Sequence, residues 1–217
     1  AQFANALVKL GVKPGDRVTA QVEKSIENVC LYLGCLKAGA AYNPLNTAYT
    51  VPELDYFIGD AQPTVVVVPA DKLARIEPIA AKHHVHSVVS LEADGSGSLA
   101  ALAKGESTSH TTVARAKDDL AALLYTSGTT GRSKGAMITH ENLASNALTL
   151  HSYWGFVPGD VLLHALPIFH VHGLFVALNT AFLNASKILW HAKFDLEPVL
   201  KRLPEASVMM GVPTFYT

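Results

Sequence analysis

Residues 125–135 read Tyr-Thr-Ser-Gly-Thr-Thr-Gly-Arg-Ser-Lys-Gly, and this stretch decides how the rest of the chain is interpreted. It follows an apolar run at 120–125 and precedes a helical pattern that begins near His140. A buried strand, a glycine-rich turn and a helix in this order are typical of α/β proteins. The stretch therefore predicts a loop at the end of a strand.

The chemistry of this loop favours an anionic ligand. Gly128, Gly131 and Gly135 can adopt positive φ and allow a close approach of the backbone. Successive N–H groups in such a turn form a concavity that binds anions, and Lys134 adds a mobile positive charge. We predict phosphate binding by the hydroxyl, glycine and lysine residues of the loop, which are Thr126, Ser127, Gly128, Thr129, Thr130, Gly131, Ser133 and Lys134.

Two better-known motifs fail to match the same residues. A Walker loop requires glycine, four residues and then Gly-Lys-Ser/Thr, but Ser133 follows Gly128 where the second glycine belongs. A nucleophile elbow requires Gly-x-Ser-x-Gly, and Ser127 lacks both glycines in that register. A Walker-type NTPase and a serine hydrolase are therefore disfavoured. A serine- and glycine-rich surface loop without function is the plainer alternative.

Apolar runs alternate with helical patterns along the chain, which predicts layered βα subdomains with largely parallel sheets. The predicted strands are 17–22, 41–44, 64–68, 87–90, 120–125, 161–165, 187–191 and 207–211. The predicted helices are 2–10, 25–38, 51–61, 73–82, 141–153, 172–183 and 196–203. The polar stretch 93–117 is the most loop-like region, and we expect a subdomain junction within it.

The composition indicates a globular protein. Of its 217 residues 49% are hydrophobic, so it can bury a substantial core. A formal net charge of −1 provides no reason to expect nucleic acid or an anionic membrane as a partner. The longest apolar-leaning stretch, 173–183, is shorter than the roughly 20 residues of a spanning helix. Cys30 and Cys35 lack metal-ligand spacing, no secretory signal is visible, and we expect a cytoplasmic protein.

Two histidines follow the predicted strand 161–165. His170 precedes the predicted helix 172–183, where an anion would meet the positive end of the helix; a capping or packing role is the alternative. His172 shares a face with His170 if the backbone is extended, but neither a carboxylate nor a thiolate is near in sequence. We therefore predict no metal site and a structural role for His172.

The loop at 125–135 resembles the phosphate-loop signature of the adenylate-forming superfamily, which includes acyl-CoA synthetases, luciferases and peptide-synthetase adenylation domains. Other stretches that agree are Asn43-Pro44-Leu45-Asn46, Pro167-Ile168-Phe169-His170-Val171-His172-Gly173 and Gly211-Val212-Pro213-Thr214. Within the superfamily the chain is most similar to bacterial malonyl-CoA synthetases, through residues 45–50 and 210–217.

This resemblance implies an ATP-dependent acid–CoA ligase that activates malonate or methylmalonate through an acyl-adenylate. The implied co-substrates and cofactors are ATP, Mg²⁺ and coenzyme A. Lys134 would stabilise the departing pyrophosphate, and His170 would orient the substrate carboxylate and the α-phosphate. Asn46, Thr47 and Tyr49 match a family stretch near the substrate side, but a structural strand-to-helix loop explains them equally well.

The resemblance also implies that residues 1–217 form only the N-terminal part of the AMP-binding domain. The mobile C-terminal domain and the acidic magnesium ligand are absent from this sequence, and the arginine expected to pair with a second carboxylate would lie beyond Thr217. Two alternatives stay open: another adenylate-forming ligase, which uses a monocarboxylate or loads a carrier protein, and a non-catalytic nucleotide-binding module formed by the isolated fragment.

Overall fold

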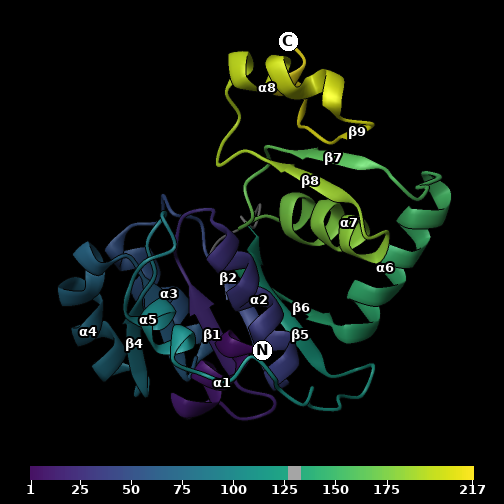
Figure 1. Cartoon of the computed structure of the whole chain (residues 1–217). Helices are drawn as coiled ribbons and strands as arrows, with labels where there is room; N and C mark the ends of the chain where they lie inside the picture. Colours follow the sequence, from purple (N-terminus) through teal and green to yellow (C-terminus); the bar gives the residue numbers. More distant parts are fainter. Residues whose placement is uncertain (127–132) are drawn as a thin grey trace. The chain divides into compact units, whose positions relative to one another are not determined.

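The computed structural model describes residues 1–126 and 133–217. The chain forms two compact units, Ala1–His140 and Glu141–Thr217 (Figure 1). The predicted α/β class with mostly parallel sheets is confirmed. The stretch 93–117, in which we expected a subdomain junction, lies inside the first unit, and the second unit begins after His140.

The first unit is built on a six-stranded sheet with the order β4-β3-β1-β2-β5-β6. Its strands are β1 (Arg17–Ala20), β2 (Ala41–Pro44), β3 (Val65–Val68), β4 (Ser87–Ser90), β5 (Leu120–Thr126) and β6 (Lys134–Thr139). The first five are parallel, and β6 runs antiparallel to β5. The four valines of β3 are all buried, as expected for an inner strand that is covered on both faces.

The helices of the first unit cover both faces of this sheet. They are α1 (Gln2–Lys9), α2 (Ile26–Ala38), α3 (Val51–Ala61), α4 (Leu73–Lys82) and α5 (Ser98–Lys104). Right-handed crossovers place α2 and α5 on one face and α3 and α4 on the other, and α1 contacts α2 and α5 while α3 contacts α4. The helix that follows β1 and the helix that follows β2 therefore lie on opposite faces of the sheet. The carboxyl ends of these two neighbouring strands form the topological switch point, where open α/β sheets commonly bind ligands.

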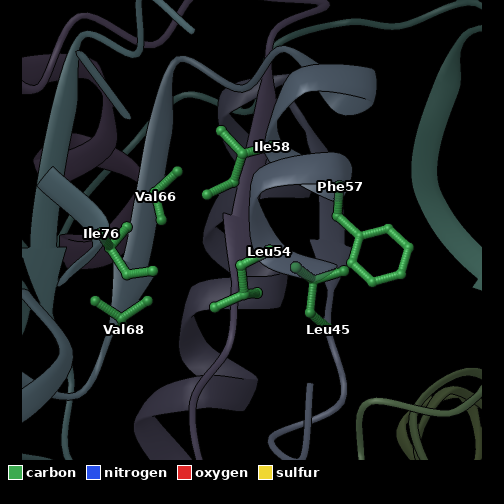
Figure 2. Close-up of a cluster of buried hydrophobic side chains, with 7 residues drawn as sticks. All are labelled: Leu45, Leu54, Phe57, Ile58, Val66, Val68 and Ile76. Carbon is green, nitrogen blue, oxygen red and sulfur yellow. The ribbon is translucent and has the colours of Figure 1, made fainter. Parts of the chain in front are cut away.

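A core cluster beneath α3 holds this helix on the sheet (Figure 2). Leu54, Phe57 and Ile58 have helical spacing and share one face of α3. Their neighbours in the cluster include Val66 and Val68, which are alternate residues of β3 and so point to the same face. Burying each such side chain contributes about 1.5–3 kcal/mol, so α3 is firmly attached to the sheet.

The second unit contains a three-stranded parallel sheet with the order β8-β7-β9. Its strands are β7 (Val161–His164), β8 (Lys187–Trp190) and β9 (Val208–Met209). Its helices are α6 (His140–Tyr153, which begins at the last residue of the first unit), the π-helical segment η2 (His172–Leu178), α7 (Asn179–Leu183) and α8 (Leu196–Arg202). Short 3₁₀ turns are η1 (Ala70–Lys72), η3 (Leu203–Glu205) and η4 (Pro213–Phe215). No helix among the described residues is long and apolar enough to cross a membrane.

Two elements of the structure are missing from the predicted secondary structure. The stretch 93–117 is not entirely loop, because α5 lies inside it and buries Leu99 and Ala103. Serine and glycine residues on both sides conceal this short helix in the sequence. The strand β6 was absent from the predicted strands, since its residues alternate poorly between apolar and polar side chains. It lies at the edge of the sheet, where such a pattern is tolerated.

Candidate functional site

The β5–β6 hairpin carries the predicted phosphate-binding residues. Thr126, the last residue of β5, pairs with Lys134, the first residue of β6. Thr126 and Lys134 are both exposed, and Ser133 is half-buried. Of the other predicted binding residues, Ser127, Gly128, Thr129, Thr130 and Gly131 lie outside the described residues. The described part of the site therefore places one ammonium group and the hydroxyls of Thr126 and Ser133 at the end of the hairpin that adjoins residues 127–132.

Gly135 has a different role from the one expected. Its φ is not in the left-handed region, so the predicted use of positive φ is wrong at this position. A Cβ atom there would lie 2.9 Å from Cδ1 of Leu123 and 3.4 Å from the ring of Tyr125. Glycine is favoured because β6 approaches the side chains of β5 closely, directly beside Lys134.

The carboxyl ends of β1 and β2 are joined by a polar network that the sequence motifs did not reveal. The side-chain amide of Gln21 donates to the backbone oxygens of Asn46 and Tyr49, at 2.9 Å each. Lys72 donates to Oε1 of Gln21 at 2.9 Å. The side-chain oxygen of Asn46 accepts from the N–H of Ala48 at 2.9 Å. These bonds favour the structural interpretation of the loop Asn46–Tyr49.

Lys24 is a second residue at this edge that motif reasoning missed. It lies just after β1, and only 8% of it is exposed. Burial lowers the pKa of its ammonium group to about 7. The signal available in the sequence was a polar run, Glu23-Lys24-Ser25, that directly follows a buried strand. A perturbed lysine at the switch point of an α/β sheet marks a region where ligands are commonly bound.

His170 lies in the second unit, two residues before η2. Its backbone oxygen accepts from the N–H of Leu174 at 3.1 Å, and its ring contacts that of Phe169 with 4.5 Å between centroids. The side chain is exposed, yet partial burial of the ring lowers its pKa below the ordinary 6.5. The imidazole is therefore neutral at pH 7, with one nitrogen able to donate a hydrogen bond and the other able to accept one.

The motif around His170 is shaped by close backbone contact. A Cβ atom at Gly173 would lie 2.0 Å from the backbone oxygen of Pro167, so the start of η2 can touch the preceding turn only with glycine there. His164 is buried, and its Nε2 is 2.9 Å from the carbonyl oxygen of Gly173. A carbonyl only accepts, so Nε2 of His164 carries the proton.

His172 lines a cavity of about 440 Å³ in the second unit, together with Met210, Gly211 and Tyr216. Within residues 1–126 and 133–217, no three His, Cys, Asp or Glu side chains come close enough to hold a metal ion. Both cysteines are unpaired thiols.

Comparisons with known proteins agree with this architecture. The family described as AMP-binding enzyme matches residues 1–217. A feruloyl-CoA synthase from Amycolatopsis sp is 32% identical over 222 residues, which cover 100% of this chain and 42% of that protein. The mitochondrial malonate–CoA ligase of Mus musculus is 30% identical over 216 residues, covering 96% of this chain and 36% of the ligase.

Solved structures extend the similarity to three dimensions. ATP-bound MatB from Rhodopseudomonas palustris is 55% identical with a TM-score of 0.96, and the match covers 99% of this chain and 42% of that one. The chain thus spans about two fifths of the length of these relatives. The predicted similarity to the N-terminal part of acyl-CoA synthetases is confirmed. The chain therefore belongs to the AMP-binding enzyme family.

Proposed function

We propose that the complete protein is an ATP-dependent, AMP-forming acid–CoA ligase for malonate or methylmalonate. The carboxylate oxygen of the acid attacks the α-phosphorus of ATP, the bond to the bridging oxygen breaks, and pyrophosphate leaves. The thiolate of coenzyme A then attacks the acyl carbon and AMP departs. The observation that carries the proposal is Lys134, an exposed ammonium group beside Thr126 at the end of the hairpin that adjoins residues 127–132, in a chain of this family.

Lys134 acts on the phosphates in this proposal. Phosphoryl and nucleotidyl transfers depend on positioning and on neutralising charge as it develops. An ammonium group on a flexible stem can follow the leaving pyrophosphate. The predicted loop residues from Ser127 to Gly131 would supply further hydrogen bonds to the phosphates, each contributing about 1.5–3 kcal/mol when the acceptor is charged.

His170 orients the reacting carboxylate in the same proposal. A neutral imidazole can donate from one nitrogen to a carboxylate or α-phosphate oxygen without adding charge. Its lowered pKa keeps this neutral form populated at pH 7. A histidine that precedes a helix is also close to backbone N–H groups that favour anions.

Mg²⁺ is expected to accompany ATP. This ion usually keeps several waters and binds through one or two carboxylates together with substrate phosphates. In this proposal the ion arrives with the nucleotide. With free thiols at Cys30 and Cys35, a cytoplasmic location is the accompanying proposal.

The preference for malonate rests on residues 45–50 and 210–217, which resemble bacterial malonyl-CoA synthetases, and on the malonate–CoA ligase relative. The feruloyl-CoA synthase is similarly related, which favours a monocarboxylic acid as the alternative substrate. A panel of malonate, methylmalonate, acetate and benzoate, each with ATP, Mg²⁺ and hydroxylamine, distinguishes a diacid substrate from a monocarboxylic acid. Hydroxamate from the two diacids supports the proposal, and hydroxamate only from acetate or benzoate overturns the diacid assignment.

Replacing Lys134 tests the proposed site itself. We expect Lys134→Ala in the complete protein to lower the rate of ATP–pyrophosphate exchange by about 10²–10³-fold, the usual effect of removing one group that stabilises transition-state charge. Lys104→Ala removes an exposed lysine from the end of α5 and is expected to keep the full rate. Equal rates for Lys134→Ala and the unaltered protein would exclude the role of Lys134.

The isolated 217 residues provide a further test. As a nucleotide-binding module they should bind an ATP analogue, and we expect no hydroxamate from them with malonate. Hydroxamate formed by this chain alone would show that the remaining three fifths of its relatives' length is dispensable for adenylation.

A further inference from the structure

One helix holds both strands of the hairpin at the end that adjoins residues 127–132. The hydroxyl of Tyr56 in α3 donates to the backbone oxygen of Ser133 at 2.7 Å, directly before β6. The hydroxyl of Tyr125 in β5 donates to Oδ2 of Asp60 in α3 at 2.6 Å. Tyr56 and Asp60 are four residues apart and so lie on the same face of the helix. The two bonds flank Thr126 and Lys134, which pair with each other.

The core cluster holds an adjoining side of α3, and Tyr56 and Tyr125 also pack against this cluster. Figure 2 shows Leu54 and Ile58 between α3 and β3, and Phe57 on the same helix. The ring of Phe57 also contacts that of Tyr125, with 4.4 Å between centroids. The helix is therefore a rigid connection between the centre of the sheet and the end of the hairpin at its edge.

The environment of Tyr125 stabilises its hydrogen bond to Asp60. Burial, and then the neighbouring Asp60, raise the pKa of Tyr125 above its ordinary value, so its hydroxyl keeps the proton that it donates. Hydrogen bonds to an ionised acceptor are roughly twice as strong as those between neutral groups. The bond from Tyr56 to Ser133 is partly buried, which limits competition from water.

We propose that Tyr56 and Asp60 are positioning residues of the adenylation reaction, which fix the end of β5 and the start of β6 and thereby the place of Lys134. The inference rests on the function proposed above. A flexible lysine helps a transition state only if the backbone that carries it is held within about 0.5 Å of the productive position. Neither residue needs to touch ATP, so the expected effect is on the rate of the chemical step.

Variants of α3 test this role in the complete protein with malonate, by ATP–pyrophosphate exchange. We expect Tyr56→Phe and Asp60→Ala to lower kcat by about 10–100-fold, as misplacement of a catalytic group does, with KM for ATP changed less than threefold. Asp60→Asn keeps an oxygen acceptor for Tyr125 and should recover part of the rate.

A matched control lies on the same helix. Asp55 is bonded to Lys82 and His83, and within residues 1–126 and 133–217 it has no bond to the hairpin. It lines the same cavity of about 500 Å³ as Tyr56 and Asp60. Asp55→Ala should therefore keep kcat. Amide hydrogen exchange should become faster in β5 and β6 with Tyr56→Phe and Asp60→Ala, and stay unchanged with Asp55→Ala.

The outcomes separate the two proposals. Full kcat in both Tyr56→Phe and Asp60→Ala, with an active unaltered protein, overturns the positioning role and leaves the ligase function intact. Equal losses in Asp55→Ala would indicate general damage to α3 and also overturn it. An unaltered protein without exchange activity on any acid of the panel overturns the proposed function and the positioning role together.

Discussion

At the scale of single residues, His164 and His170 show how the environment gives two histidines near η2 different roles. His164 is buried, and its Nε2 donates a hydrogen bond to the backbone oxygen of Gly173. Its ring stacks on that of Trp190, with 5.4 Å between the ring centroids. Its role is structural. His170 is exposed, with a partly covered ring, and is the one of the two that is available to a ligand.

The lowered pKa of His170 leads to a prediction on pH. Protonation favours the unfolded chain, in which the pKa is ordinary, so this group decreases folding stability as pH falls below 6.5, its ordinary pKa. We expect NMR titration of the imidazole to give a midpoint below 6.5, and adenylation to decline as pH falls through that midpoint. Comparison with His170→Gln assigns the NMR signal of this imidazole. The same substitution should abolish the decline of adenylation at low pH. A midpoint at or above 6.5 would contradict the prediction.

At the scale of elements, most helices and strands were well predicted, whereas the helix α5 and the edge strand β6 were not. The bounds of α3, α4, β2 and β4 match the expectation at both ends, because caps and apolar periodicity act within a few residues. The helix predicted at 172–183 is present but begins as the π-helical segment η2. The strand predicted at 207–211 is shortened to Val208–Met209, and the 3₁₀ turn η4 follows four residues later.

The start of η2 provides a test at this scale. We expect Gly173→Ala to destabilise the second unit by about 1–3 kcal/mol, because the new methyl group would lie 2.0 Å from the oxygen of Pro167. Urea unfolding followed by far-UV circular dichroism measures the change. Gly105→Ala is the control, since its φ is not in the left-handed region and its Cβ would meet nothing nearer than 3.5 Å. Similar stability for Gly173→Ala and the unaltered chain would exclude this contact.

At the scale of the whole molecule, each unit has its own hydrophobic core. The first unit contains the cluster that includes Leu54, and the second contains a cluster built around Leu163 and Leu189. Both tryptophans, Trp154 and Trp190, belong to the second unit. Tryptophan fluorescence therefore reports the unfolding of that unit alone.

This division predicts independent responses to core substitutions. We expect Leu163→Ala, at a fully buried position, to destabilise the second unit by about 2–5 kcal/mol and to shift the fluorescence transition. Amide protection in β3 should stay unchanged. Leu54→Ala should do the reverse, with faster exchange in β3 and an unchanged fluorescence midpoint. Equal loss of protection in β3 with Leu163→Ala would mean that the chain unfolds as one cooperative unit.

The sequence by itself determined the features that depend on residues close to one another along the chain. The valines of β3 predict an inner strand, Ser25 caps α2 and Gly39 ends it in the left-handed conformation, and residues 125–135 identify the family through local loop chemistry. The candidate site residues Lys134 and His170 came from the same kind of signal.

Only the tertiary structure decided which distant groups meet. The bonds from Tyr56 to Ser133 and from Tyr125 to Asp60 join residues 77 and 65 positions apart. The link from Gln21 to the Asn46–Tyr49 loop and the pairing of β6 are of the same kind. Such contacts leave no periodic pattern in a sequence, because a hydrogen bond depends on the place of two groups in space and not on their spacing along the chain.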